Sequence, residues 1–371
     1  MASKVPDIRF KGYSDTWEQR KLSSVADNIG TGKSKYISGK AESNKEKYPV
    51  LGSTGIISYD SSFDYSGSFI LTARVGANAG NLYSFNGDVK ITDNTIFIEY
   101  ENEYFLFELL NNYNIKRLSF GTGQPLIKAS ELKSLSLSLP TSMNEQADVG
   151  CTFSYMNKLI TLHQRKLKQL ELLKKALLQN MFPKAGQNIP AIRFTGFTDD
   201  WEQRKLSTFA DRFDNLREPI IAGKRVNGDT PYYGANGIQD YVDGYTHDGD
   251  FLLIAEDGAN DLSNYPVRRV NGKVWVNNHA HVVAGKMDEA DNEFLANSFK
   301  TINIEPFLVG GGRAKLNSDV MMKLEFKLPE YQEQKEIGSL LGKVDDLLIL
   351  HQRKLNSLEK LKKLLLQKMF I

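Results

Sequence analysis

Apolar residues recur at heptad spacing in two stretches of the chain, residues 159–182 and 347–370. Neither stretch contains Gly or Pro, and Leu, Lys, Gln and Glu dominate both, so each is predicted to form a long helix. Seventeen of the 24 positions are identical, and such closely matched apolar seams indicate helices that pack on each other as a coiled coil. The predicted seam contains Ile160, His163, Leu167, Leu170 and Leu177 in the first helix and Leu348, His351, Leu355, Leu358 and Leu365 in the second.

Polar residues interrupt both seams at matching places, Lys174 in the first helix and Lys362 in the second, besides the two histidines. Such positions in a coiled coil commonly fix the register of the helices. Leucines off the seam that are expected to be exposed, such as Leu162, Leu173 and Leu178, exceed what a contact between two helices needs. This surplus of apolar surface suggests a protein partner.

A second repeat precedes the helices. Residues 6–27 and 190–211 agree at fifteen of 22 positions, including the run Trp-Glu-Gln-Arg-Lys-Leu that begins at Trp17 and at Trp201. The chain therefore consists of two tandem units of roughly 185 residues, a length that suits duplicated domains. Each unit is predicted to run from this opening segment through a globular middle into a long helix. The two tryptophans are expected to pack the opening segments against the helix bases.

The two middles share a skeleton but differ in their surface residues. Short apolar runs between Gly, Asn and Asp clusters predict strands joined by tight turns. A short helix is predicted after these strands in each middle, at residues 103–112 and at residues 289–300. Residues 69–78 correspond to 251–260, and residues 92–98 are expected to correspond to 276–282. Because the helices and opening segments are near copies, the sequence predicts one scaffold that presents two different surfaces.

Helix length suggests what this scaffold is for. A continuous helix from about residue 145 to residue 182 would span roughly 55–60 Å, and only a few residues connect it to the second opening segment. If the second helix returns beside the first, the two run antiparallel, with a globular domain at each end and an approximate two-fold axis. A separation of a few tens of Å between the two domains would be comparable to one to one and a half turns of B-DNA, at about 34 Å per turn. The pattern favours a DNA-binding protein that contacts two unlike half-sites.

Composition narrows the class of protein. Hydrophobic content of 41% and charged content of 25% are ordinary for a soluble globular protein, and no apolar run approaches the length of a membrane span. The single cysteine, Cys151, excludes an internal disulfide framework, so a cytoplasmic location is expected. The net charge of +2 says nothing about partners, and the distribution of charge has to be considered instead.

Motifs for catalysis are weak. Residues 27–34 resemble a phosphate-binding loop, but Asp27 stands where the first Gly is required, and the second unit has no counterpart. The sequence contains no Pro-Pro pair, which a methyltransferase catalytic motif would need. His279 and His281 alternate along a predicted strand, and no third ligand candidate is expected near them, so no metal site is expected. The chain is interpreted as non-catalytic.

Candidate DNA contacts are polar and basic side chains in Gly- and Asn-rich turns, because phosphates attract Lys and Arg while Arg, Lys, Asn and Gln bind base edges. Arg74 and Arg313 are the best candidates, since one follows an apolar strand and the other three glycines. The candidates in the first unit are Lys33, Lys35, Tyr36, Arg74, Asn78, Asn94, Arg117 and Gln124. Those in the second are Arg217, Lys224, Arg225, Asn236, Asn260, Asn278, His279, Arg313 and Lys315.

Together, the opening segments, the duplicated middles and the repeated Gln-Arg-Lys-Leu helices resemble the specificity subunit of type I restriction-modification systems, over essentially the whole chain. The resemblance implies an α+β fold in which two α/β target recognition domains are separated by two long antiparallel helices that form a coiled coil. The implied segments are a first recognition domain with its opening segment (1–140), a first spacer helix (141–184), a second recognition domain (185–329) and a second spacer helix (330–371).

The resemblance also implies the function and the partners. Each recognition domain would bind one half of a bipartite double-stranded DNA target, and the helices would set the spacer and bind two methyltransferase subunits. Restriction and translocase subunits would then join. Adenine methylation, ATP hydrolysis and cleavage, with S-adenosylmethionine, ATP and Mg²⁺, would belong to those partners, and no cofactor is expected in this chain.

Two alternatives stay open at this point. A coiled-coil scaffold whose globular domains bind proteins would show no sequence preference for DNA and no salt-dependent DNA affinity. A solitary methyltransferase would bind S-adenosylmethionine without a partner.

Overall fold

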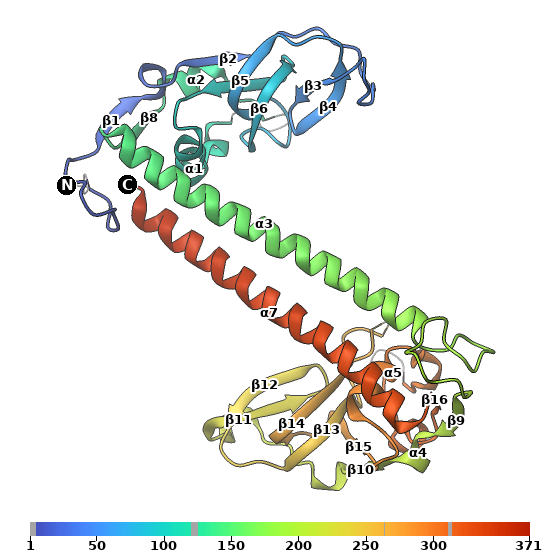
Figure 1. Cartoon of the computed structure of the whole chain (residues 1–371). Coiled ribbons are helices and arrows are strands. Elements are labelled where there is room, and N and C mark those ends of the chain that lie inside the picture. Colours follow the sequence, from blue (N-terminus) through green and yellow to red (C-terminus); the bar gives the residue numbers. More distant parts are fainter. Residues whose placement is uncertain (1–4, 120–124, 263, 311–313) are drawn as a thin grey trace. The chain divides into compact units, whose positions relative to one another are not determined.

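The computed structural model describes residues 5–119, 125–262, 264–310 and 314–371. It divides into two compact units, residues 1–164 with 353–371, and residues 165–352. Each unit contains one globular domain and a part of both long helices, α3 (Met143–Asn180) and α7 (Tyr331–Met369). In Figure 1, α3 is green and α7 is red.

The globular domain of the first unit is built on a six-stranded sheet in the order β2-β7-β5-β6-β3-β4. Neighbouring strands are antiparallel except β3 and β6, which are parallel. Apolar residues of these strands and of helix α1 form the core with Trp17 and Phe370. The strands are β2 (Asn28–Thr31), β3 (Tyr48–Gly52), β4 (Gly55–Asp60), β5 (Tyr65–Ala73), β6 (Leu82–Ile91) and β7 (Thr95–Glu99).

Short helices and a two-stranded ladder connect this sheet to α3. The ladder pairs β1 with β8 in antiparallel register, and β8 leads directly into the long helix. The predicted short helix at residues 103–112 is confirmed as α1. These elements are β1 (Glu18–Lys21), η1 (Leu22–Ser24), α1 (Glu103–Tyr113), η2 (Ile115–Leu118), α2 (Ala129–Ser134) and β8 (Ser136–Leu139).

The second unit repeats this topology, with a six-stranded sheet in the order β10-β15-β13-β14-β11-β12 and a ladder of β9 and β16. Its single parallel pair, β11 with β14, is the counterpart of β3 with β6. The strands are β9 (Glu202–Lys205), β10 (Ala210–Arg212), β11 (Asn227–Gly234), β12 (Gly237–Val242), β13 (His247–Ala255), β14 (Val267–Val276), β15 (Ala280–Gly285) and β16 (Glu325–Leu328). The helices are α4 (Leu206–Phe209), η3 (Asp214–Leu216), η4 (Ala222–Lys224), α5 (Asn292–Phe299), η5 (Glu305–Phe307) and α6 (Ser318–Met321).

The strand registers correct one correspondence between the repeats. Ala73 pairs with Thr95 and its counterpart Ala255 pairs with Ala280, so Thr95 matches Ala280 and not His279. The expected match of residues 92–98 with 276–282 is therefore one residue out. It was wrong because the second middle has three additional residues between β13 and β14, compared with β5 and β6, and the short apolar runs do not reveal how many are inserted. In the corrected register, Ile96 corresponds to His281.

Each opening segment is fixed to the base of the long helix that follows it by a buried ion pair. Arg9 donates through Nε and Nη2 to both oxygens of Glu145, at 2.6 and 2.7 Å, and Trp17 Nε1 donates to the same carboxylate at 3.3 Å. Arg193 binds Glu333 in the same way, at 2.7 and 2.8 Å. The repeated sequence motif thus encodes one structural clamp twice.

Aromatic packing confirms the structural role expected for the tryptophans. Trp17 contacts the rings of Phe105 and Phe370, with centroids 6.1 and 6.3 Å away. In the second unit Trp201 contacts Phe182 and Phe294, at 5.9 and 5.6 Å. Each globular domain is therefore packed against the end of the long helix that comes from the other repeat.

Within each unit the parts of α3 and α7 run antiparallel. In the first unit, Phe370 stacks near Phe153, and Lys362 donates to Asn157 at 2.8 Å, so later residues of α7 meet earlier residues of α3. In the second unit, Lys174 of α3 is paired with Asp345 of α7. The two lysines that interrupt the predicted seam thus have specific partners across the helix pair, as a register-setting position requires.

The predicted seam residues are the less exposed positions of both helices. Leu167 and Leu355 are buried, whereas Leu162 and Leu173 off the seam are each 47% exposed. The expectation that Leu178 is exposed too was wrong, because this side chain is half-buried against the core of the second unit. A continuous coiled coil along the whole length of the helices stays a prediction. The remaining seam residues are half-buried, namely Ile160, His163, Leu170, Leu177, Leu348, His351, Leu358 and Leu365.

Candidate nucleic-acid interface

In the first unit, the turn between β6 and β7 is hydrogen-bonded to the ends of three other strands, β2, β3 and β5. Gly32 N–H donates to Thr95 O after β2, Thr92 N–H donates to Leu51 O of β3, and Arg74 N–H donates to Asn94 O after β5. We call this region, residues 31–36, 52–55, 73–81 and 92–95, the turn edge of the first unit. Backbone hydrogen bonds make it a defined surface although it consists mostly of turns.

Arg74 lies at the centre of this turn edge. Its N–H bonds to Asn94 O, and its carbonyl accepts from Ile127 N–H, both at 2.9 Å. The bonds fix the backbone of Arg74 between the β6–β7 turn and the segment that leads into α2, while its side chain is half-buried. The candidates Arg74 and Asn94 are therefore brought together, as DNA contacts on one surface would have to be.

The loop after Arg74 carries another candidate, Asn78, which is exposed and accepts a hydrogen bond from Asn81. Gly80 closes the loop with a φ of 85°, and a Cβ there would lie 2.7 Å from Lys116 Cα. This close approach places the loop against η2, where Arg117 lies over the Tyr113 ring with its Cζ 3.8 Å from the centroid. Only Gly permits both the left-handed backbone and the contact.

The remaining candidates of the first unit follow β2. Lys33 and Lys35 are exposed, and Tyr36 is 39% exposed. Residues 28–31 form the strand β2 itself, so the stretch 27–34 does not have the strand-to-helix loop that binds phosphate in nucleotide-binding proteins. Gln124 lies outside the described residues.

The second unit has the same turn edge, formed by residues 212–217, 234–237, 255–260 and 276–280. Glu256 occupies the place of Arg74, since its N–H donates to His279 O at 2.9 Å and its carbonyl accepts from Leu316 N–H at 2.7 Å. Asn236 joins the β11–β12 turn to the neighbouring loop, donating to Gly258 O at 2.9 Å and accepting from Asn260 N–H at 3.0 Å. Asn278 is exposed beside His279.

Several basic candidates of the second unit are engaged within the protein. Arg217 donates to Glu256 at 2.6 Å and to Ala280 O at 2.9 Å, and its side chain is only 15% exposed. Arg225 pairs with Asp240 and lies over the Tyr232 ring. Lys224 is exposed, and Lys315 is 45% exposed although it pairs with Glu256. Arg313 lies outside the described residues.

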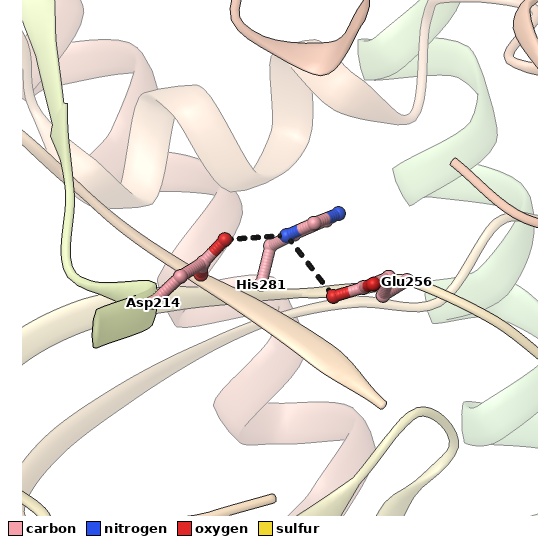
Figure 2. Close-up of side chains that lie close together, drawn as sticks. All are labelled: Asp214, Glu256 and His281. Carbon is pink, nitrogen blue, oxygen red and sulfur yellow. Dashed lines mark hydrogen bonds and ion pairs between the residues drawn. The ribbon is translucent and has the colours of Figure 1, made fainter. Parts of the chain in front are cut away.

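A buried group of charges that sequence analysis missed lies at this turn edge (Figure 2). His281 Nδ1 is 2.7 Å from Asp214 Oδ2 and 3.6 Å from Glu256 Oε2, and the His281 side chain is 1% exposed. The expectation that no third metal-ligand candidate lies near the histidines was wrong in its premise, because folding brings two carboxylates to His281. The alternation of His279 and His281 was the only signal in the sequence.

These three side chains place donor atoms within 4.8 Å of one another, a spacing at which metals can be bound. The carboxylates are already satisfied by other groups, however. Arg217 and Lys315 bind Glu256 at 2.6 and 2.8 Å, and Val282 N–H binds Asp214 at 2.8 Å. The arrangement fits an ion-pair network better than a metal site.

Electrostatics support ionised carboxylates in this network. Burial would raise the pKa of Asp214, but the hydrogen bond and charge of His281, together with Val282 N–H and Arg217, outweigh burial and lower it. Burial would likewise raise the pKa of Glu256, but Lys315, Arg217 and His281 lower it. Both carboxylates therefore accept hydrogen bonds as anions near neutral pH.

The two units contain the same domain fold twice, with different side chains at the matching turn edges, so the chain is a tandem duplication of one domain. The family described as the type I restriction modification DNA specificity domain matches residues 14–172 and 198–360, one copy in each repeat. The chain therefore belongs to this family, and recognition of DNA sequence is the function of the family.

Curated relatives agree with this assignment. A putative type I restriction enzyme specificity subunit of Haemophilus influenzae is 45% identical over 140 residues, 38% of this chain and 36% of that protein. The EcoprrI specificity subunit of Escherichia coli is 29% identical over 34% of this chain and 31% of that protein. The matched segments thus span about a third of the length of these relatives.

A solved structure shows the same fold over the whole chain. The crystal structure of a type I restriction-modification system S subunit from M. genitalium superposes with a TM-score of 0.76 and covers 99% of both chains, at 17% sequence identity. In the described part of the chain, none of the helices combines the length and apolarity that crossing a bilayer requires.

Proposed function

We propose that this chain is the specificity subunit of a type I restriction-modification complex in which each unit binds one half of a bipartite DNA target through its turn edge. The observation that carries the proposal is the correspondence of Arg74 and Glu256. Both residues make the same two backbone hydrogen bonds at the same place in the fold, yet their side chains have opposite charges. The two units thus carry differently charged side chains at equivalent positions of the same fold, as recognition of two unlike half-sites requires.

The exposed apolar side chains of the two long helices indicate binding sites for other proteins. The exposed leucines Leu162, Leu173, Leu361 and Leu364 lie on α3 and α7, with exposed fractions of 47% each. Apolar side chains on the outer faces of two helices are typical of a surface that binds other proteins. We propose that two methyltransferase subunits bind there and that restriction subunits join them.

Catalysis in this proposal belongs to those partners. They would bind S-adenosylmethionine, ATP and Mg²⁺ and carry out adenine methylation, ATP hydrolysis and DNA cleavage. The chain itself would contribute the geometry of recognition, with the number of residues in α3 and α7 fixing the number of base pairs between the half-sites.

The experiment selects bound duplexes from a random-sequence pool with the reconstituted complex of this chain and methyltransferase subunits. We expect a two-part motif with a fixed spacer, and an affinity whose logarithm falls linearly with the logarithm of salt concentration. The Arg74→Ala variant should lose base preference in one part of the motif only. Arg20→Ala, which removes an exposed arginine on β1 of the same unit, serves as the control and should leave both parts intact.

Two outcomes would count against the proposal. Equal loss of preference in both parts with Arg74→Ala would contradict the assignment of one half-site to each unit. Binding without any sequence preference would favour a protein-interaction scaffold, the alternative that the sequence also allowed.

A further inference from the structure

Two buried histidines of the second unit differ in what their ring nitrogens face. His247 has Nε2 at 3.1 Å from Phe213 O and Nδ1 at 2.7 Å from the hydroxyl of Thr246. A hydroxyl can donate as well as accept, so a neutral imidazole satisfies both contacts by donating once and accepting once. Burial lowers the pKa of His247, in agreement with a neutral ring.

His281 faces acceptors on both sides. Its Nδ1 is 2.7 Å from the carboxylate of Asp214, and its Nε2 is 2.8 Å from the backbone carbonyl of Leu316. A carbonyl oxygen cannot donate, and Asp214 is ionised, so each contact is favourable only if the ring nitrogen carries a hydrogen. The geometry therefore requires both ring nitrogens of His281 to donate. Glu256 adds a second negative charge 3.6 Å from Nδ1.

The second of these bonds holds one particular segment. Leu316 follows the loop whose base is closed by two hydrogen bonds between Val309 and Lys315, each 2.9 Å long. The same segment is joined to Glu256 through Leu316 N–H and through the Lys315 ammonium, at 2.7 and 2.8 Å. His281 thus connects the base of the 309–315 loop to Asp214 at the start of η3, across the turn edge.

The first unit does without this connection. Ile96 stands at the place of His281, and Ile127 N–H bonds to Arg74 O where Leu316 N–H bonds to Glu256 O. Both Ile96 and Ile127 are fully buried. The two units therefore stabilise the same loop base by different means, apolar packing in the first and a buried charge network in the second.

We propose that His281, as a doubly protonated ring, is a positioning residue for recognition by the second unit, holding the base of the 309–315 loop on the turn edge. The proposal rests on the proposed function of the turn edge. Its effect should be confined to one half-site, because the first unit contains an isoleucine at this position.

Nuclear magnetic resonance of the full chain with ¹⁵N-labelled histidine tests the protonation directly. The chain has five histidines, and the His281→Gln variant assigns the signals of His281. In neutral buffer we expect two ring N–H signals for His281 and one for His247. A single ring N–H at His281 would overturn the proposal, whatever the DNA-binding result.

Half-site selection tests the consequence, with the same complex and random pool as above. We expect His281→Ile and His281→Gln to reduce base discrimination about tenfold, the worth of a hydrogen bond to a charged group, in the part of the motif that Arg74→Ala leaves intact. Asn292→Ala is the matched control. It removes a buried side chain that binds Gly285 N–H and Asp250 O in the same unit, away from the loop.

The outcomes separate this inference from the proposed function. A two-part motif that His281→Gln leaves unchanged, or relaxes to the same degree as Asn292→Ala, would refute the positioning role and leave the function standing. Absence of any two-part motif for the unmodified chain would refute the function instead. Since His281→Ile could prevent folding, His281→Gln and the spectrum of the unmodified chain keep the inference testable.

Discussion

Replacement of Arg9 by Met tests the clamp between the opening segment and α3. The change removes the two charge-assisted hydrogen bonds to Glu145, at 2.6 and 2.7 Å, and leaves a carboxylate that is 1% exposed. Removing one partner of a buried ion pair costs about 3–5 kcal/mol. The Arg9 side chain is 11% exposed, so water can partly replace it, and we expect about 3 kcal/mol, at the lower end of that range.

Urea unfolding can measure this loss separately for the first unit. The chain has three tryptophans, and Trp201→Phe with Trp275→Phe leaves Trp17, in the core of the first unit, as the fluorescent reporter. With a slope of about 2–3 kcal/mol per M urea, a loss of about 3 kcal/mol lowers the midpoint by about 1–1.5 M. The twin change Arg193→Met breaks the same clamp on Glu333. It should lower the midpoint measured in a second reporter chain, in which Trp17→Phe and Trp275→Phe leave Trp201 as the fluorescent reporter.

A double-mutant cycle completes the test. Arg9→Met combined with Glu145→Gln should cost much less than the sum of the two single changes, because the second change no longer leaves a buried charge unpaired. A loss below about 1 kcal/mol for Arg9→Met, or strict additivity, would refute the argument that the clamp is a tightly coupled buried pair.

Three further predictions concern other parts of the chain. Lys362→Ala should destabilise the first unit more than Lys174→Ala destabilises the second, because it leaves the 1% exposed Glu108 with Asn157 as its remaining partner among the residues that the structure describes, whereas Asp345 is 30% exposed. Thermal unfolding of the two variants compares the two losses. Gly80→Ala should destabilise the first unit by about 1–3 kcal/mol, because it places a Cβ against Lys116 at a backbone φ of 85°. Gly76→Ala is the control: it has a similar φ of 88° but open space around the Cβ, so it separates the cost of the clash from the cost of the backbone strain. Burial lowers the pKa of His247, so the contribution of this residue to the stability of the second unit is fully present above about pH 6.5 and is lost as the pH falls through the folded pKa. Urea midpoints measured between about pH 8 and about pH 5 should therefore fall towards acid pH, and His247→Gln should flatten this slope.

Much of the architecture could be predicted from the sequence because the opening segment and the long helix each occur twice in it. The heptad pattern located both helices, and the matched segments around Trp17 and Trp201 revealed the duplication. Lys174 and Lys362 have partners on the facing helix, whereas their role in setting the register of the helix pair stays a prediction. Repetition supplied what a single copy would not, since coincident apolar patterns at two places are difficult to explain by chance.

The details of the turn edge were less accessible. Arg217 was an obvious DNA candidate by residue type, yet it lies against Glu256, because a pattern of turns does not show which charges meet after folding. His281 gave no sign of its contacts with Asp214 and Leu316, which are 67 and 35 residues away in sequence. Apolar periodicity determines which side of a strand is buried, but contacts between distant loops depend on the whole fold.

The central claim is that one chain recognises two DNA half-sites. The positions of methylated adenines in DNA test it most directly. The chain is co-expressed with its methyltransferase subunit, and methylated adenines in the host DNA are mapped at single-base resolution. The account predicts a split motif of two unlike parts separated by a fixed number of unspecified bases. A single contiguous motif would contradict it, because two separate recognition domains could not then each contribute one half.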